Sequence, residues 1–149
     1  MQITNCSKNI MMIGNLHNVH TLEIHHNFVF GENLIGDINI ANIRNTQSLH
    51  TLKLNLYKHI KYVYNLSSLS ELDITFCKNI KDIGSLRNLK ILKVHEKVNG
   101  IQYLKNLDEI VIMYDNKCSQ INSNHNIKKQ LAKLIKINPV IKIKEEYIR

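Results

Sequence analysis

Histidine is the residue type in this chain best suited to chemistry, because its imidazole binds metal ions and titrates near neutral pH. The chain has eight histidines, and four of them fall close together in the pattern described below: His20, His25, His26 and His50. His25 and His26 are adjacent in an extended segment, where neighbouring side chains point to opposite sides. No His-x-x-x-His or Cys-x-x-Cys pair completes a tetrahedral set of ligands. The sequence therefore predicts no metal site.

The three cysteines predict neither a disulfide nor a nucleophile. An odd number of cysteines in a chain with a single proline is unlike a disulfide-stapled secreted scaffold. Cys6 and Cys77 stand at equivalent places that suit a small buried side chain, and Cys118 has no histidine or asparagine companion. The sequence also lacks a phosphate-binding glycine loop, a nucleophile elbow and a catalytic carboxylate pair. We therefore expect no enzyme activity and no cofactor.

Length and charge narrow the function further. The chain has 149 residues, with 20 lysines and arginines against 12 aspartates and glutamates, for a formal net charge of +8. This length and a hydrophobic content of 44% suit one domain with a sizeable core. The basic excess favours an anionic partner without identifying it. Since there is no secretory signal and no run of roughly 20 apolar residues, we expect a cytoplasmic protein without a membrane contact.

A repeated spacing of apolar residues dominates the chain. A leucine is followed by apolar residues three, six and eight positions later, and this order recurs in segments that begin at Leu16, Leu66, Leu86 and Leu104; a segment that begins at Thr46 has the same order with a polar residue at its first position. An alignment of residues 3–10 with residues 74–80 adds an equivalent segment at the N-terminus. The last apolar positions are then Ile3, Ile24, Leu54, Ile74, Val94 and Ile112, in steps of 21, 30, 20, 20 and 18 residues.

On these residues the chain resembles the leucine-rich repeat proteins, with L-x-x-L-x-L segments and a period close to the 20 to 29 residues of that family. Cys6, Asn27 and Cys77 stand three residues after the last apolar position, as in its short and cysteine-containing classes. The resemblance implies an α/β fold, a right-handed solenoid of six to seven repeats. A parallel sheet would line its concave face, with short helices or turns on the convex face. Less regular turns are expected where that position holds Tyr57, Lys97 and Asp115.

The expected repeats occupy residues 1–123, with one irregular, longer repeat at residues 25–54. Residues 124–149 break the period and are predicted to cap the stack. In this segment a helical face is expected from the spacing of Ile127, Leu131, Leu134 and Ile135. Asn138 and Pro139 would end the helix, and a last strand would follow at residues 140–144, with the charged residues 145–149 closing the end.

The N-terminal edge of the expected sheet has no preceding segment to cover it. An uncovered edge strand pairs readily with another chain. Three alternatives stay open: self-association of two copies through this edge, a poor cap formed by residues 1–10, or a chain that is a fragment of a longer array.

The outward side chains of the strands are expected to form columns, with one residue per strand at a spacing of about 4.8 Å. One column alternates in sign over four strands, which fits both mutual support within the sheet and recognition of a polar partner. It is expected to contain Gln2, Glu23, Lys53, Asp73, Lys93, Val111 and Lys142. The next column and its neighbours add apolar and aromatic side chains of the kind enriched at interfaces. The predicted partner-binding residues on the concave face are Glu23, His25, Lys53, Asn55, Asp73, Thr75, Phe76, Lys93, His95, Val111, Met113 and Tyr114.

The predicted function is binding of another protein through this concave face. One alternative is binding of nucleic acid or another polyanion by the lysine-rich C-terminal cap, whose ordinary explanation is a solvated helix face. Another is a host-directed effector from a large DNA virus or an intracellular parasite. That alternative rests on a bias toward isoleucine, asparagine and lysine, which an AT-rich genome would produce through codon usage.

Overall fold

The computed structural model describes residues 2–4, 18–25, 47–55, 63, 66–115 and 125–147. Its strands are β1 (Gln2–Thr4), β2 (Thr21–His25), β3 (Thr51–Asn55), β4 (Glu71–Ile74), β5 (Ile91–His95), β6 (Glu109–Tyr114) and β7 (Lys142–Tyr147). A 3-10 turn, η2 (Ile101–Tyr103), and an α-helix, α2 (His125–Ile137), complete the described elements. The chain is thus of the α/β class. Cys6, His26, Leu56, Cys118 and most of the long expected repeat lie outside the described residues.

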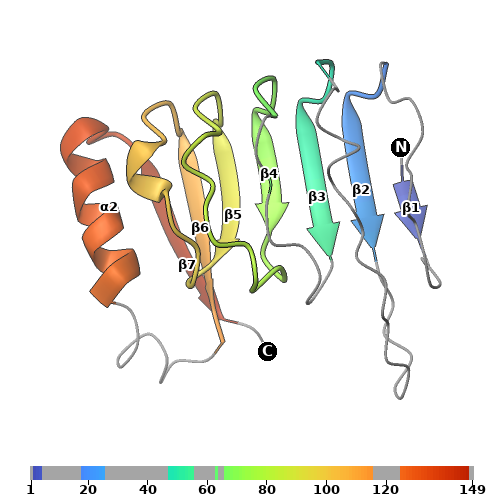
Figure 1. Cartoon of the computed structure of the whole chain (residues 1–149). Coiled ribbons are helices and arrows are strands. Elements are labelled where there is room, and N and C mark those ends of the chain that lie inside the picture. The colour runs from blue at the N-terminus through green and yellow to red at the C-terminus, as the bar shows by residue number, and fades with distance from the viewer. Residues whose placement is uncertain are drawn as a thin grey trace.

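The described strands form one open parallel sheet in which spatial order follows sequence order, from β1 to β7 (Figure 1). The register agrees with the alignment made from the sequence. Ile3 pairs with Ile24, Ile24 with Leu54, and Val94 with Ile112. Apolar residues that the spacing predicted to be equivalent therefore lie opposite one another on neighbouring strands.

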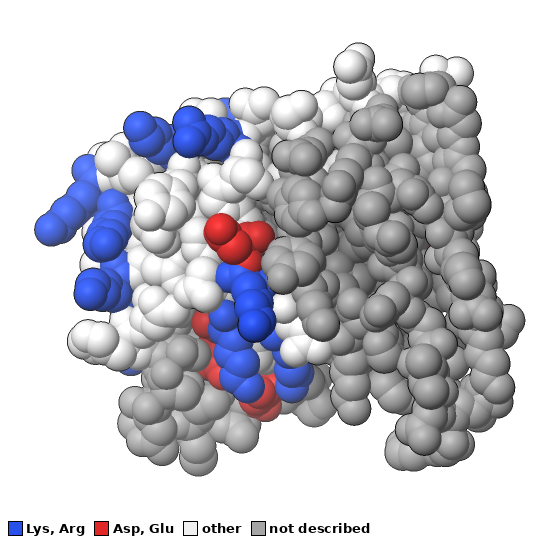
Figure 2. Space-filling view, in the orientation of Figure 1, with Lys and Arg blue, Asp and Glu red and all other residues white. Residues whose placement is uncertain are grey.

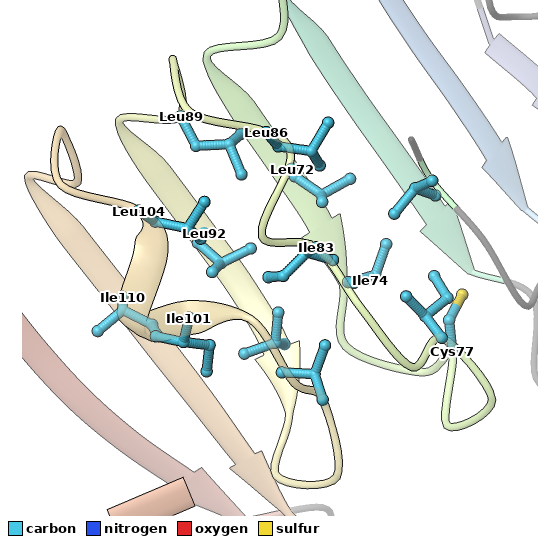
Figure 3. Close-up of a cluster of buried hydrophobic side chains, with 14 of the residues drawn as sticks. Leu72, Ile74, Cys77, Ile83, Leu86, Leu89, Leu92, Ile101, Leu104 and Ile110 are labelled. Carbon is cyan, nitrogen blue, oxygen red and sulfur yellow. The ribbon is translucent and has the colours of Figure 1, made fainter. Parts of the chain in front are cut away.

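The core lies on the side of the sheet that carries α2. In each strand from β2 to β5 the second and fourth residues are buried, because side chains alternate along a strand and this pair faces inward. The leucines ahead of each strand turn onto the same core, as Leu86, Leu89 and Leu104 do beside Leu72 and Leu92 (Figure 3). Cys77 is buried in this cluster, as predicted, and its Sγ lies 3.4 Å from the Leu54 carbonyl oxygen.

Neighbouring strands from β2 to β6 are joined at their starts by a shared backbone acceptor. The carbonyl oxygen of Ser70, the residue before β4, accepts two N–H groups, from Lys90 just before β5 at 2.7 Å and from Ile91, its first residue, at 3.0 Å. The carbonyls of His20, His50 and Lys90 accept two N–H groups each in the same way. These bonds hold the strands at equal height along the sheet.

Asparagine side chains add a second connection between neighbouring segments. Asn88 donates to the Ser67 carbonyl at 2.6 Å, and Asn106 donates to the Arg87 carbonyl at 2.9 Å. Both stand one position before the second leucine of their segments. Their recurrence in the sequence was the available signal for this role, which the apolar spacing alone did not predict.

The helix α2 packs on the core near β6. Ile127, Leu131 and Leu134 are buried, but Ile135 is 42% exposed, so its expected place on the buried face was wrong. The fourth inward position belongs instead to Gln130, which is buried. Its Oε1 accepts the Ile101 N–H at 3.1 Å and its Nε2 donates to the Val98 carbonyl at 3.2 Å. The amide thereby satisfies backbone groups at the start of η2 that the end of the sheet leaves unpaired.

The last strand has a different register from the one expected. Its alternation placed Lys142 beside Val111, whereas Lys144 pairs with Val111 and the strand continues to Tyr147. The shift of two residues brings Lys144 within 2.8 Å of Glu109 and places Glu145 where it accepts a hydrogen bond from Tyr114. The charged residues 145–147 therefore extend the strand rather than follow it.

Gly100 meets a conformational requirement just before η2. Its φ of +94° is one that residues with a Cβ rarely adopt, and an added Cβ would lie 2.3 Å from Asp82 Oδ1 and 2.5 Å from the Gly84 nitrogen. Here the segment at residues 82–84 and residues 99–100 run side by side, through a parallel bridge between Asp82 and Asn99. This contact joins two successive connections on the α2 side of the sheet.

We predict that Gly100→Ala lowers the free energy of unfolding by about 1–3 kcal/mol, because it adds both backbone strain and a clash with backbone atoms. Gly84→Ala is the matched control. Its Cβ would meet the Tyr103 ring at 2.8 Å, and an exposed ring can rotate away. Urea denaturation of both variants measures the difference. Equal losses of stability would contradict the role assigned to Gly100.

Candidate functional site

The outward face of the sheet is the candidate site, because it is open. Parallel sheets are almost always covered on both faces. Here one face packs on the core, while the other exposes polar side chains from β2 to β5. Glu23, Lys53, Asp73 and Lys93 retain between 19% and 44% of their side-chain surface. We call this surface the open face, defined by the outward residues of β2 to β7.

Two ion pairs on the open face join β2 to β3 and β4 to β5, with the alternation of sign predicted from the sequence. Lys53 lies 2.9 Å from Glu23, and Lys93 lies 4.0 Å from Asp73. The hydrogen bond with Glu23 raises the pKa of Lys53. The His25 imidazole lies 3.6 Å from the same glutamate. The charge ladder therefore satisfies part of its own charge, while its side chains stay accessible.

Apolar residues stand where the ladder would otherwise place like charges side by side. Ile91 pairs with Glu71 on one side and Glu109 on the other. Val111 likewise stands between Lys93 and Lys144. Like charges directly opposite one another destabilise a sheet. The open face is therefore a mosaic in which no two paired residues of the described strands carry the same charge.

Four of the predicted site residues are less accessible than expected. Thr75, His95, Val111 and Tyr114 are all more than nine-tenths buried. Tyr114 belongs to the hydrophobic core, so its predicted contact with a partner was wrong. Glu23, His25, Lys53, Asn55, Asp73, Phe76, Lys93 and Met113 keep partial exposure.

The hydroxyl of the buried Tyr114 has a hydrogen-bond partner inside the structure. Burial raises the pKa of this phenol, and the nearby Glu145 carboxylate, which accepts its hydrogen bond at 3.1 Å, raises it further. The ring lies 6.0 Å from that of Tyr147, tilted by 33°. Because β6 extends to Tyr114, the alternation that buries Ile110 and Ile112 also turns Tyr114 inward.

A cluster of charges at the carboxyl ends of β5 and β6 was also missed. Asp115 accepts hydrogen bonds from Lys78 and from His95 Nε2, the latter at 3.1 Å, and Lys97 lies 3.6 Å away. His95 Nδ1 accepts the Lys97 backbone N–H, so Nε2 carries the proton that bonds to Asp115. Lys97 and Asp115 are two of the positions that depart from the Asn or Cys of the repeat pattern. That paired departure was the sequence signal.

The same cluster brings together the atoms of a conceivable cation site. Ligand atoms of His95, Glu96 and Asp115 lie within 4.8 Å of one another. Asp115, however, already binds the ammonium group of Lys78, with that of Lys97 close by. A divalent cation would have to displace one ammonium group and sit beside the other. The arrangement favours an ion-pair cluster over a metal centre.

Comparison of the chain with models of protein families, with curated proteins and with solved structures finds no match. Within the described residues, no helix combines the length and the apolar character that crossing a membrane requires. Function is therefore inferred from the geometry of the described surfaces.

Asp115 makes stability depend on pH. Partial burial by itself raises the pKa of Asp115, but hydrogen bonds from Lys78 and His95 and their electrostatic attraction outweigh it and lower the pKa to about 2. A carboxylate with a depressed pKa stabilises the fold above its unfolded pKa of about 3.9 and loses that contribution as the pH falls toward its folded value. We expect Asp115→Asn to cost about 1–2 kcal/mol at pH 7 and progressively less between pH 4 and pH 2.

The control for this prediction is Asp108→Asn, which removes an exposed carboxylate with no ion pair recorded among the described residues. Chemical denaturation across the pH range compares the two variants with the wild-type chain. A constant deficit for Asp115→Asn from pH 7 to pH 2 would contradict the assignment.

The mosaic of charges on the open face predicts opposite outcomes for two substitutions of one residue. Ile91 is 38% exposed between two glutamates. Ile91→Glu places three carboxylates in a row, whereas Ile91→Lys places a cation between two of them. We expect the lysine variant to be more stable by about 0.5–1 kcal/mol in low salt, with the gap narrowing in 1 M NaCl. Thermal unfolding at both ionic strengths measures this difference in stability. Equal stability of the two variants in low salt would contradict the role assigned to Ile91, which is to keep the two glutamates apart.

Proposed function

We propose that the chain is a leucine-rich repeat solenoid that acts as a non-enzymatic module and binds another protein through the open face. The apolar spacing in the sequence supports the family assignment. The strand register supports it too, since equivalent residues of successive segments lie side by side. Stacked units of this kind bury a continuous core and present an extended sheet surface.

The observation that carries the proposal is the accessibility of one face of a parallel sheet. Such a sheet rarely leaves a face to solvent, and the open face here bears a fixed pattern of charges on rigid strands. Side chains held on strands keep their relative positions, which suits recognition of a complementary surface. Ile91 and the half-buried Met113 add apolar contact area beside the charges.

The partner is expected to have both signs of charge at matching spacing. Along the ladder a partner would meet Glu23, Lys53, Asp73 and Lys93 in turn, about 4.8 Å apart. An arrangement of alternating sign contributes to specificity and orientation more than to affinity. The apolar residues beside it would supply part of the affinity.

A charge exchange tests this function while keeping the fold. Glu23→Lys, Lys53→Glu, Asp73→Lys and Lys93→Glu, combined in one variant, keep opposite charges on paired strands but reverse the charges that a partner meets. Cross-linking and affinity capture identify binders of the wild-type chain, and the purified binder is then titrated against wild-type and variant proteins. We expect the exchange to leave the melting temperature within a few degrees and to weaken binding at least about tenfold.

The matched control is Lys105→Gln, which removes one charge near η2 and changes none on the open face. It should bind the partner as the wild-type chain does. Unchanged affinity of the charge-exchanged variant, with an intact fold, would mean that the ladder serves the sheet alone, and it would refute the proposed site.

A further inference from the structure

The basic excess of the described residues comes from one element. Outside α2, these residues hold equal numbers of basic and acidic side chains, ten of each. α2 has four lysines and no acidic residue. The described part of the molecule is thus a neutral body with a helix of charge +4 at one end.

The four lysines share the outer side of α2. In a helix of 3.6 residues per turn, Lys129, Lys133 and Lys136 lie within about 60° of one another around the axis. Lys128 borders this stripe. The buried residues Ile127, Leu131 and Leu134 point to the opposite side. All four lysines are exposed, and none has a carboxylate within 4.0 Å among the described residues.

The surrounding surface continues the basic character. Figure 2 shows blue atoms over α2 and along the upper edge of the described surface, while the red atoms lie toward the centre and below, where further blue atoms adjoin them. No acidic group of the described residues interrupts the basic surface in that view. An anion approaching α2 therefore meets attraction along the full length of the helix, about 20 Å.

The composition of the stripe argues against two kinds of anionic partner. A helix that binds a membrane surface inserts its apolar face between lipids, but here that face is packed on the core. Protein interfaces draw their affinity from apolar and aromatic anchors and are depleted in lysine. The exposed Ile135 and Ile137 stand at opposite margins of the helix and do not form one patch with the lysines.

Binding to a phosphate backbone requires neither an exposed apolar helix face nor aromatic anchors. Duplex nucleic acid carries one negative charge per roughly 1.7 Å of its axis, so about twelve phosphates span the length of α2. Flexible lysines with no competing carboxylate neutralise such charges without base contacts. We propose that α2 binds the backbone of double-stranded nucleic acid, independently of base sequence, as a second binding surface separate from the open face.

The test measures binding of a fluorescent 30-base-pair DNA duplex of mixed sequence by anisotropy between 30 and 200 mM NaCl. For the wild-type chain we expect a slope of log affinity against log salt of about −3 to −4, as four phosphate contacts would give. Lys129→Gln, Lys133→Gln and Lys136→Gln are combined in one variant. It should bind on the order of 100-fold more weakly at 50 mM salt, with a slope shallower by about 2 to 3.

Two further variants keep the result interpretable. Lys53→Gln, Lys93→Gln and Lys144→Gln together remove the same three charges from the open face and should leave DNA binding within about twofold of wild type. Arginine at positions 129, 133 and 136 retains the charge and should retain binding, which separates loss of charge from loss of folding. Circular dichroism checks the helix content of each protein.

Several outcomes would overturn the proposal. These are no binding by the wild-type chain at 30 mM salt, unchanged binding by the glutamine variant of α2, or an equal loss in the open-face variant. Binding of polyglutamate or of phosphatidylserine vesicles as tight as that of the duplex would also overturn it, by showing a different anionic partner. Comparable binding of an RNA duplex would support recognition of the backbone.

Discussion

The apolar side chains of each strand are buried only because the next strand repeats them at the same height. Leu52, Leu72 and Leu92 follow one another across the sheet in register, and all are fully buried. No single segment encloses a core, so every strand depends on its neighbours. Side chains alternate along a strand, so a slip of one residue would move a leucine to the open face and a lysine or aspartate into the core. The register therefore fixes the core and the surface pattern together.

Where the array of strands ends, a different element must complete both the core and the hydrogen bonds. α2 does this with two kinds of contact. Its leucine and isoleucine side chains replace those that a further segment would supply, and Gln130 pairs with the Ile101 N–H and the Val98 carbonyl. A buried amide with both ends satisfied stabilises this junction, whereas an apolar residue there would leave two backbone groups unpaired. Gln130 is polar although it lies on the inward side of α2, because the backbone groups that it covers need hydrogen-bond partners.

The sequence alone predicted the strands from β1 to β6 and their register, because each apolar pair recurs with little variation in spacing. It failed for β7, where Ile141 and Ile143 alternate in a way that fits two registers. The choice between them depends on the contacts of Glu145 with Tyr114 and of Lys144 with Glu109, which join residues about thirty positions apart. The burial of His95 depends in the same way on Asp115. On the open face the alternating charges were predictable, and the inward turn of Tyr114 follows from the alternation that buries Ile110 and Ile112, because β6 extends to Tyr114.

The spacing of strands also explains why the net charge of the described residues collects on α2. Side chains about 4.8 Å apart on adjacent strands repel strongly when they share a sign, and the open face avoids this by alternating charges and by placing Ile91 and Val111 between like ones. A sheet built under that constraint stays close to neutral. This constraint on like charges does not apply to the outer side of α2, because its lysines spread into solvent around a curved surface. A patterned, nearly neutral sheet suits recognition of one complementary surface, and an unpaired basic helix suits attraction of a polyanion, so the two surfaces are fitted to different kinds of partner.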